Sequence, residues 1–388
     1  MIKLRFRRFL VVGVIATTLD VTLFVLLHKI GWSLILANIL ALNAAALIAW
    51  PLHRLFTLAD DPFTRWIGSP GVFGFMVVAA GLVDIGVVCL FNPNRELKAE
   101  LLAKIVAVVA AALVRAVSYR IVIFRTIRRE QDQPTKRPPS EGQYRLSVII
   151  PAYREADRIK ETIERIRKEL GSKIDDDLEI VVVDDGSKDG TETEARSADQ
   201  LIVLPQNEGK GSALRNGVAK AKGRVVAFTD ADLAYTPAQI LGLLVQIENG
   251  YDWVVGNRHH ADTRTVTEAG FIRGVGGRLV NFATHLLLLG QYRDTQCGLK
   301  AFRSDVAEAL FTASTINGFA FDVELFHLAE RWRLSLSEIP VEVEYSERTT
   351  VRAIQDGFLL LRDLIHVRRL ASRGTYTIDP DIPKASKV

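Results

Sequence analysis

The chain has 388 residues, 24% of them charged, with a formal net charge of +4, and this length favours two or three folded units rather than one. Its two cysteines, Cys89 and Cys297, are too far apart for a CxxC metal site and too few for a disulfide framework. The 15 Lys/Arg and 7 Asp/Glu of residues 1–130 flank long apolar runs, which favours contact with anionic lipid head groups and argues against nucleic acid as a partner.

The first third of the chain contains four apolar stretches, each near the ~20 residues that an α-helix needs to cross a bilayer. They are about Phe9–Ile30, Leu34–Leu52, Val72–Phe91 and Leu101–Phe124. Short polar turns join the first two and the last two, so residues 1–126 are predicted to form a transmembrane bundle of two helical hairpins. The N-terminal basic residues resemble those of a signal peptide, but the apolar run lacks a small-residue cleavage site, so we interpret it as a retained anchor.

Charged residues surround these stretches and also occur inside them. Lys and Arg gather at the N-terminus and in residues 54–65 and 120–129, which by the positive-inside rule places both ends of the bundle in the cytoplasm. A charge within a bilayer is costly unless it is paired or hydrated. Two interpretations stay open for the charges inside: ion pairs that fix helix packing, or a role in handling lipid. The residues concerned are Asp20, Asp84, Lys104 and Arg115.

The two hairpins resemble copies of each other. Asp20 and Asp84 recur in the middle of the first and third stretches, 64 residues apart. With the Arg7–Phe9 start and the repeated Arg-aromatic ends of the stretches, roughly residues 5–126 resemble the GtrA-like family of four-helix membrane proteins. That resemblance implies a link to O-antigen glucosylation and cell-wall glycolipids, in which members are proposed to move or present lipid-linked sugars.

Residues 127–143 are rich in Arg, Gln, Pro, Lys and Ser, and we expect an unpacked polar linker held near the cytoplasmic leaflet. In residues 144–350, short β-rich runs then alternate with amphipathic segments. This alternation predicts an α/β domain with a mostly parallel sheet covered by helices on both faces. The predicted strands are Leu146–Ile150, Glu179–Val183, Leu201–Leu204 and Val225–Thr229, with helices near Arg158–Leu170, Gly211–Ala221 and Pro237–Asn249.

Polar clusters follow three of these strands. They are Pro151-Ala152-Tyr153-Arg154-Glu155, Asp184-Asp185-Gly186-Ser187 and Asp230-Ala231-Asp232. Ligands of parallel α/β sheets bind outside the carboxyl ends of the strands, so we expect the three clusters to share one rim. Asp184 and Asp185 can accept hydrogen bonds from a uracil edge and ribose hydroxyls, and Gly186 permits the close turn that exposes them.

A loop and an acidic pair complete this predicted nucleotide-sugar site. The loop Asn207-Glu208-Gly209-Lys210-Gly211 allows close backbone approach, and Lys210 supplies a cation near the base or diphosphate. Asp230 and Asp232 can turn carboxylate oxygens towards a hard cation, Mg²⁺ or Mn²⁺, which neutralises a diphosphate leaving group. A lone Asp-x-Asp pattern is more often a solvated turn, but its position directly after a buried strand favours the metal site.

About residues 146–369 resemble the family 2 glycosyltransferases of the GT-A fold, in the branch that makes dolichyl- or polyprenyl-phosphate glucose. Besides the clusters and the loop, the resemblance rests on Val255-Gly256-Asn257-Arg258, Asp294-Thr295-Gln296-Cys297-Gly298-Leu299-Lys300 and Phe321-Asp322-Val323-Glu324-Leu325. It implies a set of residues that contact the nucleotide sugar: Pro151, Tyr153, Glu155, Asp184, Gly186, Lys210, Asp230 and Ala231. Arg154 departs from the usual Asn of the family. Ala234 stands where mannosyl-phosphate synthases tend to carry Gln, which favours a UDP-sugar, above all UDP-glucose, over GDP-mannose.

The resemblance also implies an inverting displacement of the nucleotide by polyprenyl phosphate. A lipid phosphate is already anionic and needs positive charge rather than a strong base, so we interpret Arg258 and Arg273 as its ligands, with surface pairing as the alternative. Asp294 and Gln296 follow the family motif and are expected at the reacting centre with Asp232 and Arg258, although Asp294 could equally brace a neighbouring loop. Asp322 and Glu324 open a helix and are not expected to be catalytic.

Two apolar segments are candidates for reaching the membrane surface from the catalytic side. Residues 279–289 are too short to span, and Val351–Leu370, within the C-terminal segment 351–388, is amphipathic with interspersed arginines. A buried core helix is the alternative for both. The expected location is the cell inner membrane, crossed several times, with the catalytic domain in the cytoplasm and a role in cell-envelope glycosylation.

Competing functions stay open at this point. A processive polysaccharide synthase needs Gln-x-x-Arg-Trp, and residues 328–332 have Leu328 in place of the Gln. Polyprenyl-phosphate transferases that use GDP-mannose or UDP-N-acetylgalactosamine are alternatives, as is a glycolipid-flipping protein with an accessory transferase domain. The intact Asp230 and Asp232 argue against the last. The sequence leaves open the choice of metal, the prenyl length and the oligomeric state, with self-association through the spans as one expectation.

Overall fold

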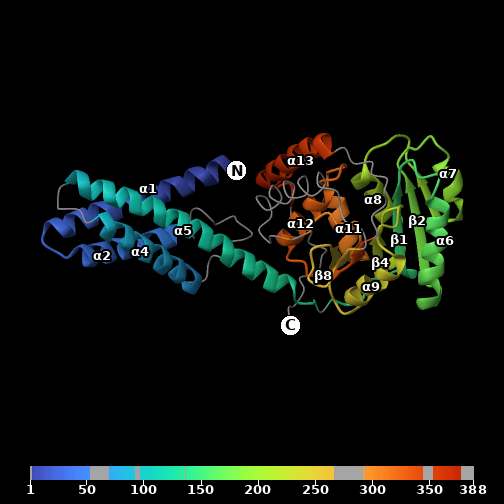
Figure 1. The fold of residues 1–388 in the computed structure, drawn as a ribbon, viewed down its shortest axis with the longest axis horizontal. Coiled ribbons are helices and arrows are strands. Elements are labelled where there is room, and N and C mark those ends of the chain that lie inside the picture. The colour runs from blue at the N-terminus through green and yellow to red at the C-terminus, as the bar shows by residue number, and fades with distance from the viewer. Residues whose placement is uncertain are drawn as a thin grey trace. The chain divides into compact units, whose positions relative to one another are not determined.

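The computed structural model describes residues 2–52, 70–91, 97–135, 137–265, 292, 294–343 and 353–376. The chain divides into two compact units, residues 1–126 and 127–388 (Figure 1). The described residues of the first unit form α-helices, and the second unit is an α/β domain.

The first unit consists of long helices whose sequences are rich in Ala, Leu, Ile and Val. Their bounds are α1 Ile2–Lys29, α2 Leu34–Leu52, α4 Pro70–Phe91 and α5 Leu97–Gln131, the last ending beyond the unit. Among the described residues, three stretches are long and apolar enough to cross a membrane: Val11–Lys29, Leu34–Leu52 and Gly74–Phe91. In α5 the corresponding apolar stretch is shorter, Leu101–Val114. The predicted helical bundle is therefore confirmed, and the fourth crossing stays a prediction.

Polarity in this unit is arranged as a lipid environment requires. Large apolar side chains such as Leu47 and Leu90 point outward, with 76% and 82% of their surface exposed. Small residues, Ala37, Ala41 and Ala107, pack around Phe24 in the interior. Polar side chains are also inside: Asp20, Asp84 and Lys104 are buried and form ion pairs. The side chain of Arg115 lies outside the described residues.

The second unit is built on a seven-stranded sheet with the order β3-β2-β1-β4-β7-β5-β8. Strands β1 to β4 are parallel, and they confirm the four strands expected from the sequence. Strand β7 runs antiparallel between β4 and β5, and β8 pairs parallel with β5. The bounds are β1 Tyr144–Ala152, β2 Leu178–Asp184, β3 Gln200–Val203, β4 Gly223–Phe228, β5 Trp253–Asn257, β7 Lys300–Arg303 and β8 Leu336–Pro340, while β6 Arg264–Thr265 and β9 Glu342–Val343 form a separate pair.

Helices cover both faces of the sheet, because side chains alternate along each strand. Val148 and Val182 face the cluster that includes α6 and α9, and Ile149 and Val181 face the cluster that includes α8, α11 and α12. The helices are α6 Ile159–Leu170, α7 Thr191–Glu194, α8 Lys210–Val218, α9 Ile240–Glu248, α11 Ser304–Ala313, α12 Phe321–Trp332 and α13 Ala353–Arg373, with 3₁₀ turns at Gly171–Lys173, Ala195–Ser197 and Pro237–Gln239. The predicted two-sided covering is confirmed.

The expected unpacked linker at residues 127–143 is instead partly folded. Helix α5 continues to Gln131, which is almost fully buried. The Thr135 hydroxyl lies 3.1 Å from Asp252 Oδ1, and Arg137 Nε lies 2.8 Å from the same carboxylate. The segment was expected not to pack because it is polar. That reasoning fails because the buried Asp252 provides partners for its polar groups.

The C-terminal helix α13 packs against the core of the second unit through part of its apolar face. Leu364 and Val367 belong to the same core cluster as α12, whereas Ile365 is 55% exposed. The alternative of a core-packed helix therefore holds for Leu364 and Val367. Residues 279–289, the other candidate membrane-contact segment, lie outside the described residues.

Candidate active site

The three polar clusters lie along one rim because their strands are neighbours in register. In the parallel pair of β1 and β2, Ala152 is opposite Asp184, and in the pair of β1 and β4, Ile149 is opposite Phe228. The chain leaves all three strands at the same edge. The structure thus brings together the segments that follow β1, β2 and β4, as the sequence predicts.

The segment after β2 shapes the rim mainly through its carboxylates. Asp185 accepts hydrogen bonds from the backbone N–H groups of Glu208 and Gly209, both at 2.8 Å, and so holds the 207–211 loop. Asp184 is completely buried and accepts a bond from Ser187 N at 3.0 Å. Gly186 has φ +72°, and a Cβ there would lie 2.4 Å from the carbonyl carbon of Gln206. These residues build the wall of the site, and direct contact of Asp184 with a nucleotide stays a prediction.

The segment after β1 is bonded to the segment after β2. Arg154 N donates to Ser187 Oγ at 2.8 Å, and Glu155 N donates to Thr191 Oγ1 at 3.0 Å. Arg154 has φ +60°, a left-handed conformation that Asn adopts more readily than Arg, which explains why Asn suits this position. Its guanidinium instead lies 5.1 Å from the centre of the Tyr153 ring.

Of the two carboxylates after β4, one is in an ion pair and the other is exposed. Asp230 Oδ1 forms an ion pair with Lys210, at the start of α8. Burial by itself lowers the pKa of Lys210, but Asp230, Asp322 and Asp232 outweigh it and raise the pKa, so this side chain stays cationic. Asp232 is exposed, with Oδ1 accepting a hydrogen bond from Ala234 N at 3.1 Å.

Asp230 and Asp232 could provide some of the ligands of a metal cation whose remaining ligands come from a substrate. Within the described ranges, no group of three or more His, Cys, Asp and Glu side chains could enclose a metal ion. Mg²⁺ is commonly held by one or two carboxylates and completes its shell with phosphate oxygens and water. Asp230 and Asp232 provide such a partial shell. A glycine at position 298 leaves space for the Asp230 carboxylate, because a Cβ there would lie only 2.2 Å from Asp230 Oδ2.

A buried ion pair that was not expected from the sequence lies next to Asp230. Lys300 Nζ is 2.7 Å from Asp322 Oδ1 and donates to the carbonyl of Cys297 at 2.6 Å. Burial raises the pKa of Asp322, while the neighbouring Lys300 and Lys210 oppose the shift. Asp322 therefore belongs to the charge network of the site instead of serving only as a helix-start carboxylate. The sequence feature that could have indicated this ion pair is Lys300, the last residue of the 294–300 segment.

Arg258 is held at the end of β5 by a two-pronged ion pair. Its Nε and Nη2 lie 2.7 and 2.8 Å from the two carboxylate oxygens of Asp294, and Arg258 N donates to Oδ2 at 3.0 Å. Burial by itself raises the pKa of Asp294, but these bonds outweigh it and lower the pKa. Arg258 is 30% exposed and keeps further N–H donors for a ligand. Asp294 thus serves as a brace, one of the two roles expected for it.

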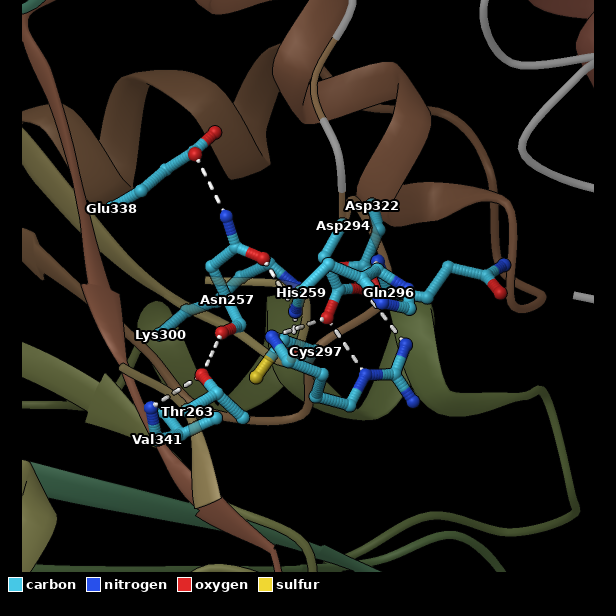
Figure 2. A network of polar contacts seen from close by, with 11 residues as sticks. Asn257, His259, Thr263, Asp294, Gln296, Cys297, Lys300, Asp322, Glu338 and Val341 are labelled. Atoms are coloured by element: carbon cyan, nitrogen blue, oxygen red, sulfur yellow. Dashed lines mark hydrogen bonds and ion pairs between the residues drawn. The ribbon is translucent and has the colours of Figure 1, made fainter. Parts of the chain in front are cut away.

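The polar network around Asp294 also fixes the turn after β5 (Figure 2). Asn257 Nδ2 donates to Glu338 Oε2 at 3.0 Å, and the Asn257 carbonyl accepts from Thr263 Oγ1 at 2.6 Å. Gln296 N donates to Asp294 Oδ1 at 3.2 Å, so Gln296 lies beside Arg258. Arg273, the other predicted phosphate ligand, lies outside the described residues, and its role stays a prediction.

Comparison with known proteins agrees with this arrangement. Residues 147–311 match glycosyl transferase family 2, and residues 8–124 match the GtrA/DPMS transmembrane domain. The dolichyl-phosphate beta-glucosyltransferase of Drosophila melanogaster is 31% identical over 304 residues, which cover 69% of this chain and 93% of the relative. The enzyme of the same name from Saccharomyces cerevisiae is 30% identical, over 60% of this chain and 76% of its own.

Among solved structures, glucosyl-3-phosphoglycerate synthase of Mycobacterium tuberculosis superposes with a TM-score of 0.45 at 20% identity, over 66% of this chain and 84% of its own. The family match spans the clusters after β1, β2 and β4, the 207–211 loop, Arg258 and Lys300. The transmembrane match spans the apolar helices of the first unit. The chain is thus a membrane protein and belongs to the family 2 glycosyltransferases.

Proposed function

We propose that this protein transfers glucose from UDP-glucose to a polyprenyl phosphate, with inversion at the anomeric carbon, on the cytoplasmic face of the cell inner membrane. The names of its relatives support a glucosyl group and a lipid phosphate acceptor. The GtrA/DPMS transmembrane domain supports an acceptor that arrives from the bilayer. Ala234, in place of the Gln of mannosyl-phosphate synthases, supports a UDP-sugar over GDP-mannose.

One observation carries the proposal: residues 294–298 contact both Asp230, one of the acidic pair, and Arg258. Gly298 lies directly against Asp230 Oδ2, and Asp294 grips Arg258 by two hydrogen bonds. The segment therefore sets a carboxylate pair suited to a diphosphate-bound cation beside a guanidinium suited to a second phosphate. A transferase that joins a nucleotide sugar to an anionic acceptor needs both.

The reaction follows from this arrangement. An oxygen of the lipid phosphate attacks the anomeric carbon of the sugar while the bond to the diphosphate breaks, and the bonding electron pair leaves with UDP. The acceptor oxygen is already ionised, so no residue has to remove a proton. Arg258 lowers the repulsion between the two phosphates and orients the attacking one. Lys210 supplies a fixed positive charge near the leaving group.

A divalent cation, Mg²⁺ or Mn²⁺, would bind at Asp230 and Asp232 and neutralise the diphosphate as it leaves. Glu155 adds to the negative field there, since Asp232 is among the charges that raise the pKa of Glu155, after the larger effect of burial. The accessible Asp232 is the residue whose loss tests the cation most directly.

The test is transfer of radiolabelled sugar from a panel of UDP- and GDP-sugars to polyprenyl phosphate by the full chain, purified in detergent with a divalent metal. We expect lipid-soluble product from UDP-glucose, abolished by EDTA and by Asp232→Asn. Product from a different donor would correct the sugar. No product from any donor, in protein shown to be folded, would overturn the proposal in favour of a glycolipid-handling protein with an accessory domain.

A further inference from the structure

The loop that carries Lys210 packs backbone to backbone against a turn formed by residues 315–318. Gly211 N donates to the Asn317 carbonyl at 2.7 Å. A Cβ at Gly209 would lie 2.6 Å from the oxygen of the same carbonyl, and a Cβ at Gly211 would lie 2.5 Å from another backbone oxygen of the turn. Both glycines are therefore needed where they stand, because a side chain at either position would push the two backbones apart. We call residues 315–318 the supporting turn.

The supporting turn is held by one buried carboxylate, that of Glu324 in the first turn of α12. Thr315 N lies 3.0 Å from each of its oxygens, Thr315 Oγ1 donates to Oε1 at 2.8 Å, and Ile316 N donates to Oε2 at 2.9 Å. Glu324 is 0% exposed, so water does not compete for these bonds. A carboxylate forms stronger hydrogen bonds with N–H and O–H donors than a neutral oxygen does, so the place of the turn depends on Glu324.

The C-terminal segment provides a further donor to this carboxylate. Tyr376, which follows α13, donates its hydroxyl to Glu324 Oε1 at 2.6 Å. Its ring belongs to the same core cluster as α12 and lies 5.8 Å from the His327 ring, measured between ring centres. Burial, and then the charge of Glu324, raise the pKa of Tyr376, so the hydroxyl keeps its proton and stays a donor. The segment considered from the sequence for membrane contact thus also completes the bonds of Glu324.

The same loop is held a second time by Asp185, which accepts two of its backbone N–H groups. Lys210 lies in the chain between the positions that Asp185 and the supporting turn fix, and its ammonium pairs with Asp230. The backbone beneath Lys210 is therefore fixed on both sides of this residue. Small displacements of a charged group at a reacting centre are costly, so the support of this loop matters for the chemistry.

We propose that Glu324 is a positioning residue for Lys210: Glu324 holds the supporting turn, the turn holds the loop, and the loop sets the ammonium beside Asp230. The inference rests on the proposed function, in which Lys210 lies near the leaving diphosphate. Glu324 acts only through the turn and takes no part in breaking the bond. Its loss therefore affects the nucleotide sugar and spares the lipid acceptor, whose phosphate is assigned to Arg258.

The test compares the full chain in detergent, with a divalent metal, as the wild type, Glu324→Gln and a matched control, Glu179→Gln. Glu179 is 1% exposed and also accepts a backbone N–H, from Lys222 at 2.8 Å, but it lies near the start of β2, away from the rim. We expect Glu324→Gln to weaken UDP binding and raise the KM of the sugar donor by about 10-fold, the effect of one hydrogen bond to a charged group. The KM of the lipid acceptor stays unchanged. Glu179→Gln lowers the Tm and leaves both KM values as they are.

Hydrogen exchange of the 207–211 amides, measured without substrate, reports the support of the loop directly. We expect faster exchange in Glu324→Gln than in the wild type or Glu179→Gln, because the partner of Gly211 N is no longer fixed. Tyr376→Phe keeps the ring and removes one bond to Glu324, so it should show the same changes in smaller size. It carries the test if Glu324→Gln does not fold.

The outcomes separate this inference from the reaction itself. In a wild type that binds UDP and transfers the sugar, unchanged UDP affinity or unchanged loop exchange in the folded variant would overturn the positioning role. Equal effects in Glu179→Gln overturn it as well, because they would show a general loss of stability. A wild type that neither binds UDP nor transfers a sugar overturns the proposed function, and this inference with it, whatever the exchange rates are.

Discussion

Lys300 and Asp322 form an ion pair of 2.7 Å in which the side chains are only 1% and 8% exposed. Lys300 comes from β7 and Asp322 from the first turn of α12, and the pair lies next to Lys210 and Asp230. Because Lys300 also bonds the Cys297 carbonyl, it fixes the segment whose Gly298 touches Asp230. The pair therefore links the acidic site to the strand beneath it.

Replacing Lys300 by Met is expected to lower the Tm markedly, because a buried carboxylate that loses its partner costs about 3–5 kcal/mol. The double variant Lys300→Met/Asp322→Leu removes both charges and is expected to recover much of the Tm. It should not recover transferase activity, since the Cys297 carbonyl loses its donor. Tm and activity are measured on all three proteins. Equal Tm values for the single variant and the wild type would contradict the role of the pair.

Gly298→Ala is expected to reduce activity by roughly 10²-fold without changing the Tm, because the new Cβ displaces the Asp230 carboxylate from its position. The matched control is Gly242→Ala in α9, where a Cβ would meet only Ile339 Cδ1 at an ordinary 3.5 Å. Initial rates over a donor concentration series test this. Unchanged rates in Gly298→Ala would show that Asp230 tolerates the displacement.

Arg258→Lys keeps the charge but loses the two-pronged contact with Asp294. We expect activity to fall by about 10–100-fold, since hydrogen bonds to charged groups contribute about 1.5–3 kcal/mol, with the larger change in the KM for the lipid acceptor. The control is Arg167→Lys, whose contact with Asp199 is exposed and should matter little. A loss confined to the KM of the sugar donor would refute an acceptor role.

His327 of α12 predicts a specific acid sensitivity. Burial, and then the charges of Arg331 and Arg368, lower its pKa from 6.5 to about 4. Between these values the unfolded chain binds a proton that the folded chain does not, so His327 makes stability fall as the pH falls from 6.5 towards 4. His327→Gln removes this contribution, which reaches about 3 kcal/mol at the acid end. Tm curves over pH test it, and parallel curves for variant and wild type would refute it.

Local sequence determined much of the fold and the approximate place of the site. The β-rich runs at β1, β2 and β4 are buried on both faces, and their lengths fit strands between helices, so their parallel pairing followed from the pattern. The polar clusters directly after them had to lie at the strand ends. The long apolar helices were equally evident, because about 20 apolar residues in succession are a local signal.

Only the tertiary structure decided which polar groups pair. Lys300 lies opposite Phe228 at the end of β4 because β7 inserts antiparallel next to that strand, and Asp185 turned out to hold the backbone of the 207–211 loop. Lys104 joins Asp20 across 84 positions of the chain. Strand insertion and ion pairing between distant residues depend on how whole elements pack, and that packing is a property of the entire chain that no local window of sequence contains.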